Sequence, residues 1–96
     1  MRAAILWLCV CGLTLADTLV VVTSDRCEPC RHLKRDLKAQ PALYAPHTLV
    51  VVEGREAVRK WRVTSVPTLI RVREGREVAR HVGYTGPADV VGLLED

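Results

Sequence analysis

Short β-branched runs alternate with amphipathic stretches along most of the chain. Thr18 to Thr23 and Thr48 to Val52 contain only Thr, Leu and Val, which predicts two buried, central strands. Thr68 to Arg73 and Glu77 to Val82 flank Glu74-Gly75-Arg76, a connection short enough for a hairpin. The pattern therefore predicts two central strands followed by an antiparallel pair.

The segment after the first strand has helical spacing. Ser24-Asp25 provides capping side chains, Pro29 suits a first helical turn, and Pro41 ends the pattern. Leu33 and Leu37 are four residues apart and so share one face. We expect an amphipathic helix here that packs on the sheet through these leucines.

Two further helices are predicted. Arg55 to Trp61 is a short one with Ala57, Val58 and Trp61 facing inward, and Gly86-Pro87 opens a last one. The order is β-α-β-α-β-β-α. A parallel βαβ unit joined through a helix to a hairpin predicts an α/β fold, in which a mixed four-stranded sheet has helices on both faces.

The N-terminus has the layout of a secretory signal. Met1-Arg2 gives a short positive start, Ala3 to Leu15 is almost continuously apolar, and Thr14 and Ala16 are small residues where a signal peptidase acts. We predict a signal peptide over residues 1–16.

A single domain over residues 17–96 follows, and cleavage implies a periplasmic or secreted protein without stable membrane contact. The alternative is an uncleaved anchor over Ala3 to Val22, which would place Asp17 in the bilayer at high cost.

The net charge of +3 does not argue for a nucleic-acid partner. The Arg-rich stretch from Arg55 to Arg80 is interpreted as the solvated faces of a helix and two strands.

Cys27 and Cys30 close a Cys-Glu-Pro-Cys box directly after the first strand, and they are the only cysteines in residues 17–96. Two thiols at this spacing, where a strand leads into a helix, are placed to exchange electrons with other thiols. Unpaired N–H groups in the first helical turn favour a thiolate there. Half of a zinc site and an inert disulfide are the alternatives, but zinc needs two more ligands and so short a ring stabilises little.

Three segments resemble the thioredoxin superfamily in its shortest form. They are the strand-box-helix junction at Val20 to Leu33, the Ser65-Val66-Pro67-Thr68 segment that opens the hairpin, and Gly83 after the last strand. The resemblance implies a cis Val66–Pro67 bond facing the cysteines, and strand-like hydrogen bonds from the Val66 backbone to a bound peptide. It also implies substrate-binding positions at Val66, Pro67, Gly83 and Tyr84.

The segment from Gly83 to Leu94 is similar to the regulatory SoxS-like thioredoxins of bacterial sulfur-oxidation clusters. Other positions depart from ordinary thioredoxin. Arg26 stands in place of the tryptophan before the box, Glu28-Pro29 in place of Gly-Pro, and Val21 in place of a buried acid. The tyrosine that glutaredoxins carry between their cysteines is absent, so glutathione binding is unsupported.

The resemblance implies a thiol-disulfide oxidoreductase in which Cys27 is the nucleophile and Cys30 the resolving thiol. Arg26 and Arg31 favour the thiolate, and Glu28 opposes it. The expected partners are a protein thiol or disulfide and a recycling redox protein, with no metal and no cofactor beyond the Cys27–Cys30 disulfide. The alternative is a thioredoxin-fold module that binds, regulates or carries a metal without general turnover.

Overall fold

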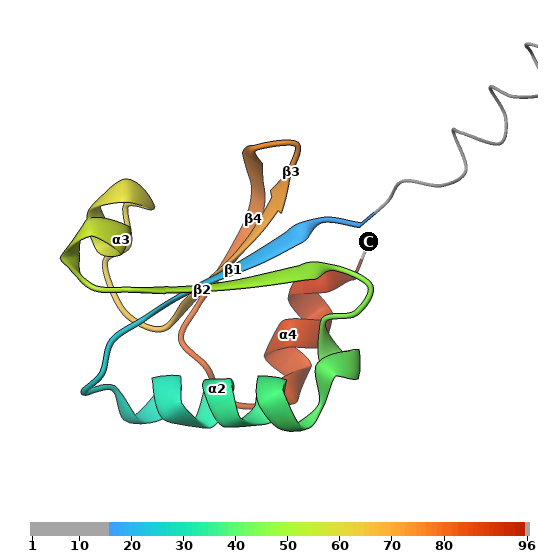
Figure 1. The fold of residues 1–96 in the computed structure, drawn as a ribbon, viewed down its shortest axis with the longest axis horizontal. Coiled ribbons are helices and arrows are strands. Elements are labelled where there is room, and N and C mark those ends of the chain that lie inside the picture. The colour runs from blue at the N-terminus through green and yellow to red at the C-terminus, as the bar shows by residue number, and fades with distance from the viewer. Residues whose placement is uncertain (1–15, 96) are drawn as a thin grey trace, which may run out of the picture.

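The computed structural model describes residues 16–95, and Figure 1 shows them as a twisted sheet between helices. The predicted signal lies outside the described residues, apart from Ala16. In chain order the elements are β1 (Thr18–Thr23), α2 (Glu28–Ala39), the 3-10 helix η1 (Pro41–Leu43), β2 (Thr48–Glu53), α3 (Arg55–Lys60), β3 (Thr68–Arg73), β4 (Arg76–Val82) and α4 (Pro87–Leu94). The predicted order of strands and α-helices is confirmed. No helix within residues 16–95 is both long and apolar enough to cross a membrane.

The four strands form one mixed sheet in the order β2-β1-β3-β4. β1 pairs with β2 in parallel and with β3 in antiparallel orientation, and β3 pairs with β4 as a hairpin. The expectation that Thr48 to Val52 is central was wrong, because β2 is an edge strand. Val50 and Val51 on it are 39% and 42% exposed. A β-branched run reports how well side chains suit a strand, and it does not report how many neighbours that strand has.

β1 divides the core into two layers, because successive side chains of a strand point to opposite faces. Leu19 and Val21 face α2 and α4, and Val20 and Val22 face α3 (Figure 1). The first layer is completed by Leu33, Leu37, Leu69 and Val90. The second is completed by Ala57, Val63 and Ile70, with Trp61 packed against them as expected. Each fully buried aliphatic side chain contributes about 1.5–3 kcal/mol to stability.

The hairpin turn is tighter than predicted. Glu74 and Gly75 both have positive φ, 52° and 79°, and form a two-residue connection. This backbone matches the right-handed twist of the flanking strands, and glycine adopts it without a steric penalty. β4 therefore begins at Arg76, one residue earlier than expected.

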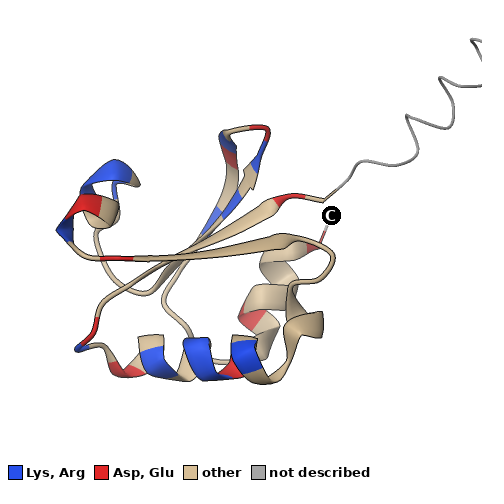
Figure 2. Cartoon of the chain, viewed as in Figure 1, with Lys and Arg blue, Asp and Glu red and all other residues tan. Residues whose placement is uncertain are grey.

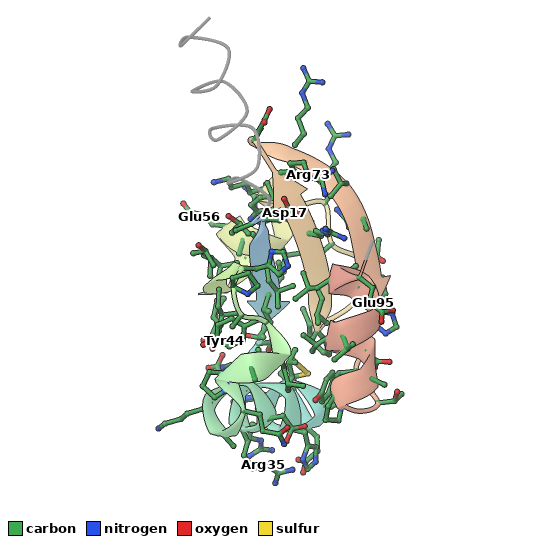
Figure 3. All side chains as sticks on the ribbon, turned by 90° about the vertical axis from the view of Figure 1, so that its right-hand side faces the viewer. Asp17, Arg35, Tyr44, Glu56, Arg73 and Glu95 are labelled. Carbon is green, nitrogen blue, oxygen red and sulfur yellow. A yellow bond between two sulfur atoms is a disulfide. The ribbon has the colours of Figure 1, made fainter. Side chains whose placement is uncertain are left out.

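One arginine of the predicted solvated stretch is buried, which corrects that interpretation. Arg71 Nε donates to Asp17 Oδ2 at 2.5 Å, and the two side chains are only 6% and 1% exposed. Arg73 binds the same carboxylate at 3.0 and 3.1 Å, and Figure 3 shows Asp17 and Arg73 together, far from Arg35 on α2. Arg71 also donates to the carbonyl oxygens of Leu93 and Glu95. The ion pair thus joins the start of β1 to β3 and to the end of α4.

The ion pair makes stability depend on pH. The hydrogen bond from Arg73, aided by Arg71, holds the pKa of Asp17 below its usual value, although burial opposes the shift. A carboxylate whose pKa is lowered on folding stabilises the fold above its unfolded pKa of about 4. That contribution is lost as the pH falls through the lower pKa of the folded state.

We predict that Asp17→Asn lowers the free energy of unfolding by about 3 kcal/mol near neutral pH, because Arg71 stays buried without its counter-ion. Urea unfolding followed by circular dichroism measures this. The difference from the wild type should shrink in acid as Asp17 is protonated. Asp25→Asn, at an exposed position, is the control and should change little. Equal stability of the Asp17 variant and the wild type near neutral pH would contradict a structural role for this pair.

Candidate functional site

Cys27 and Cys30 form a disulfide where β1 leads into α2, with their Cα atoms 5.1 Å apart. Cys27 is itself the N-cap of α2, since its Sγ accepts the Cys30 N–H at 3.2 Å. Ser24 and Asp25 were expected to cap this helix, and that prediction was wrong. The sulfur occupies the position of the capping acceptor, where an unpaired N–H of the first turn reaches it.

The two sulfurs differ in access to solvent. Cys27 is half-buried, whereas Cys30 is fully buried one turn inside α2. The expected difference in exposure is present. A thiol or disulfide from another molecule therefore reaches the Cys27 sulfur and not that of Cys30.

The segment that opens β3 lies against the exposed sulfur. The Val66–Pro67 bond is cis, and the Val66 carbonyl oxygen is 3.8 Å from Cys27 Sγ. Gly83 N–H donates to the Pro67 carbonyl at 2.7 Å, and Thr68 Oγ1 donates to the Ser65 carbonyl at 2.6 Å. β3 is itself paired with β1 on one side and with β4 on the other. The two hydrogen bonds and this pairing hold the segment in place. Val66 thus lies beside Cys27, and Gly83 is joined to Pro67, the next residue along the chain.

Tyr84 is held in a different way. Its hydroxyl donates to Asp36 Oδ2 at 2.6 Å, which ties the segment after β4 to the middle of α2. Its ring packs against the core layer under α2, and it lines a surface groove together with Glu28 and Pro29. Burial, with the hydrogen bond to Asp36, raises the pKa of Tyr84 well above its ordinary value. The hydroxyl therefore stays protonated at neutral pH and anchors the segment.

The charges flanking the cysteines are partly neutralised. Arg31 Nη2 lies 2.7 Å from Glu28 Oε1, and both side chains are exposed. The two residues expected to tune Cys27 in opposite directions therefore pair with each other. Arg26 forms no ion pair with another described residue, which leaves it as the unbalanced cation next to the box.

An open groove of about 720 Å³ adjoins the Val66 side of the site, and sequence reasoning missed it. Arg55, Arg59 and Arg62 line it, although the whole Arg-rich stretch was read as solvated faces. The four-residue spacing of Arg55 and Arg59 was an available signal, because it places both on one side of a helix.

The core layer between β1 and α2 is apolar at position 21. Val21, where the resemblance implies an acid, is fully buried in the core layer shared with α2. Across residues 16–95 no cluster of three or more His, Cys, Asp or Glu side chains is arranged to hold a metal ion.

Comparisons with known proteins agree with this geometry. The family described as a thioredoxin-like domain matches residues 14–96. Thioredoxin from Chlamydia pneumoniae is 36% identical over 87 residues, covering 86% of this chain and 80% of that protein. Thioredoxin from Chlamydia trachomatis is 30% identical over 86 residues, covering 84% of each.

A solved structure points the same way. The crystal structure of Trxlp from Edwardsiella tarda superposes with a TM-score of 0.71 at 27% identity, covering 95% of this chain and 93% of that one. The resemblance to the sulfur-oxidation subgroup stays a prediction. The chain therefore belongs to the thioredoxin-like family, and its close cysteine pair supports thiol-disulfide oxidoreductase chemistry in general terms.

Proposed function

We propose that this protein exchanges electrons with protein thiols and disulfides outside the cytoplasm, through Cys27 and Cys30. The observation that carries the proposal is the asymmetry of the pair. One sulfur caps a helix and is accessible, and the other is buried within bonding distance of it. This arrangement gives one thiol for attack and one for release.

In the reducing direction, the Cys27 thiolate attacks one sulfur of a substrate disulfide and breaks its S–S bond. The other substrate sulfur leaves as a thiolate and takes a proton from solvent. Cys30 then loses its proton and attacks Cys27 Sγ, which releases the second substrate thiol. Two electrons pass to the substrate, and the Cys27–Cys30 disulfide is left for a recycling redox partner to reduce. The reverse sequence oxidises a substrate dithiol.

The surroundings support the first step. The N-terminal end of α2 and the unbalanced charge of Arg26 both favour a thiolate at Cys27. The Val66 carbonyl oxygen lies 3.8 Å from the same sulfur, and we expect it to accept a hydrogen bond from the backbone of an extended substrate. Recognition through backbone atoms suits a protein substrate.

We predict that Cys30→Ser traps substrates as mixed disulfides with Cys27, because the thiol that would release them is gone. Non-reducing gels followed by mass spectrometry of adducts from a periplasmic or secreted extract measure this. Cys27→Ser is the matched control and should trap nothing. Absence of adducts from both variants would favour a module that binds or regulates without turnover.

In the reduced protein, we predict that iodoacetamide modifies Cys27 before Cys30, since only Cys27 reaches solvent. Peptide mapping after brief labelling over a range of pH gives the order and the apparent pKa. Labelling in urea should remove the difference between the two thiols. Faster modification of Cys30 in the folded protein would reverse the proposed roles.

For the location, we predict cleavage after Ala16, so that exported protein begins at Asp17. The basis is the basic start, the apolar stretch and the small residues Thr14 and Ala16. The intact mass of protein from the periplasmic or culture fraction tests it. Residues 1–16 still attached to membrane-bound protein would instead support the anchor.

A further inference from the structure

We propose that the groove beside Val66 binds an acidic segment of the protein substrate, next to the disulfide that Cys27 attacks. This inference rests on the proposed function and adds a substrate preference to it. The groove is formed by the end of β1, by α3 and by the connection from α3 to β3. Its lining consists of Thr23, Ser24, Gly54, Arg55, Val58, Arg59, Arg62, Val63, Thr64 and Val66.

The groove is continuous with the redox site. Val66 is one of its lining residues, and the Val66 carbonyl oxygen lies 3.8 Å from Cys27 Sγ. Thr23 and Ser24, at the other wall, begin the short connection that leads to Cys27. A polypeptide whose disulfide meets Cys27 therefore has its neighbouring residues at the mouth of this groove.

The charged side chains that line the groove are all positive. Three arginines line it and no acidic residue does. Within residues 16–95, Arg55, Arg59 and Arg62 form no ion pair. Figure 2 shows the blue residues of α3 at the same end of the sheet as the start of α2, on the left of the view.

The nearest acids in the sequence do not neutralise these arginines. Glu53, two residues before Arg55, is bound by Lys34 and Thr23, and these contacts hold its pKa below the usual value. Glu56 and Asp25 are exposed, and neither lines the groove or has an ion pair within the described residues. The positive charge of the groove is therefore left for a ligand.

The connection after α3 is held in place before any ligand arrives. Arg80 Nη2 and Nη1 donate to the carbonyl oxygens of Trp61 and Arg62 at 2.9 and 3.3 Å, and Glu77 binds the other side of Arg80. Arg62 has a φ of 53°, a left-handed conformation that is uncommon for a residue with a side chain. Contacts from β4 thus fix the wall that carries Arg62, which lowers the entropy lost on binding.

The chemistry of the lining favours an acidic polypeptide. Val58, Val63 and Val66 offer apolar surface to side-chain stems, and guanidinium groups pair well with carboxylates. No aromatic side chain lines the groove, so it lacks the platforms on which bases of single-stranded nucleic acid stack.

The test compares two peptide disulfides that differ only beside the disulfide, where one has a run of glutamates and the other a run of glutamines. The rate constant for oxidation of the reduced protein should be about tenfold higher for the glutamate peptide at low salt. Added salt should bring the ratio toward one. The variant R55Q/R59Q/R62N should lose the preference while still reacting with the glutamine peptide. Asn is used at position 62 because it tolerates a left-handed backbone.

The matched control is R35Q/K38Q/R76Q, which removes three exposed cations from α2 and the hairpin and should keep the preference. Equal rates for both peptides, or a preference that survives in the groove variant, would overturn the inference and leave the oxidoreductase function intact. If neither peptide reacts, the proposed function fails. Fluorescence anisotropy of a labelled, cysteine-free glutamate peptide then decides whether the groove binds acidic chains, by comparing the wild type with both variants.

Discussion

The burial of β1 on both faces and along both edges is the constraint on which the rest of the structure depends. Leu19 and Val21 require a cover of α2 and α4, and Val20 and Val22 require α3 on the opposite side. β2 and β3 satisfy the backbone groups at its two edges. β1 is buried from Leu19 to Thr23. The chain becomes accessible to solvent again after the strand ends, in the connection that leads to Cys27.

The two ends of β1 have opposite electrostatic roles. At its start, Asp17 is buried against Arg71, and the loss of solvation is offset by several charge-assisted hydrogen bonds that join β1, β3 and α4. At its end, the Cys27 sulfur caps a helix and is accessible. The ion pair that stabilises the fold and the sulfur that is proposed to react therefore lie at opposite ends of β1.

The redox site draws on three segments that are distant in sequence. The N-cap and the first turn of α2 supply the two sulfurs, and the segment around Val66 supplies a carbonyl beside the accessible one. α3 and the connection after it supply arginines to the adjoining groove. The Glu28–Arg31 pair balances its own charge, whereas the groove does not. The proposed reactivity at Cys27 and the proposed attraction of an acidic substrate can thus be tested by separate substitutions.

The sequence by itself determined the strands, the apolar face of α2 and the paired cysteines, because these features follow from local patterns and short spacings. The place of Pro67 came from the resemblance to the thioredoxin superfamily. Tertiary structure decided that β2 is an edge strand and that Arg71 is buried. It also gathered the arginines of α3 beside Val66. Each of these depends on which residues meet across the sheet or between elements. Asp17 and Arg71 are 54 positions apart, and hydropathy reports only that both are charged. The pairing of β1 with β3 brings Arg71 to Asp17, and the ion pair between them offsets the cost of burying the two charges.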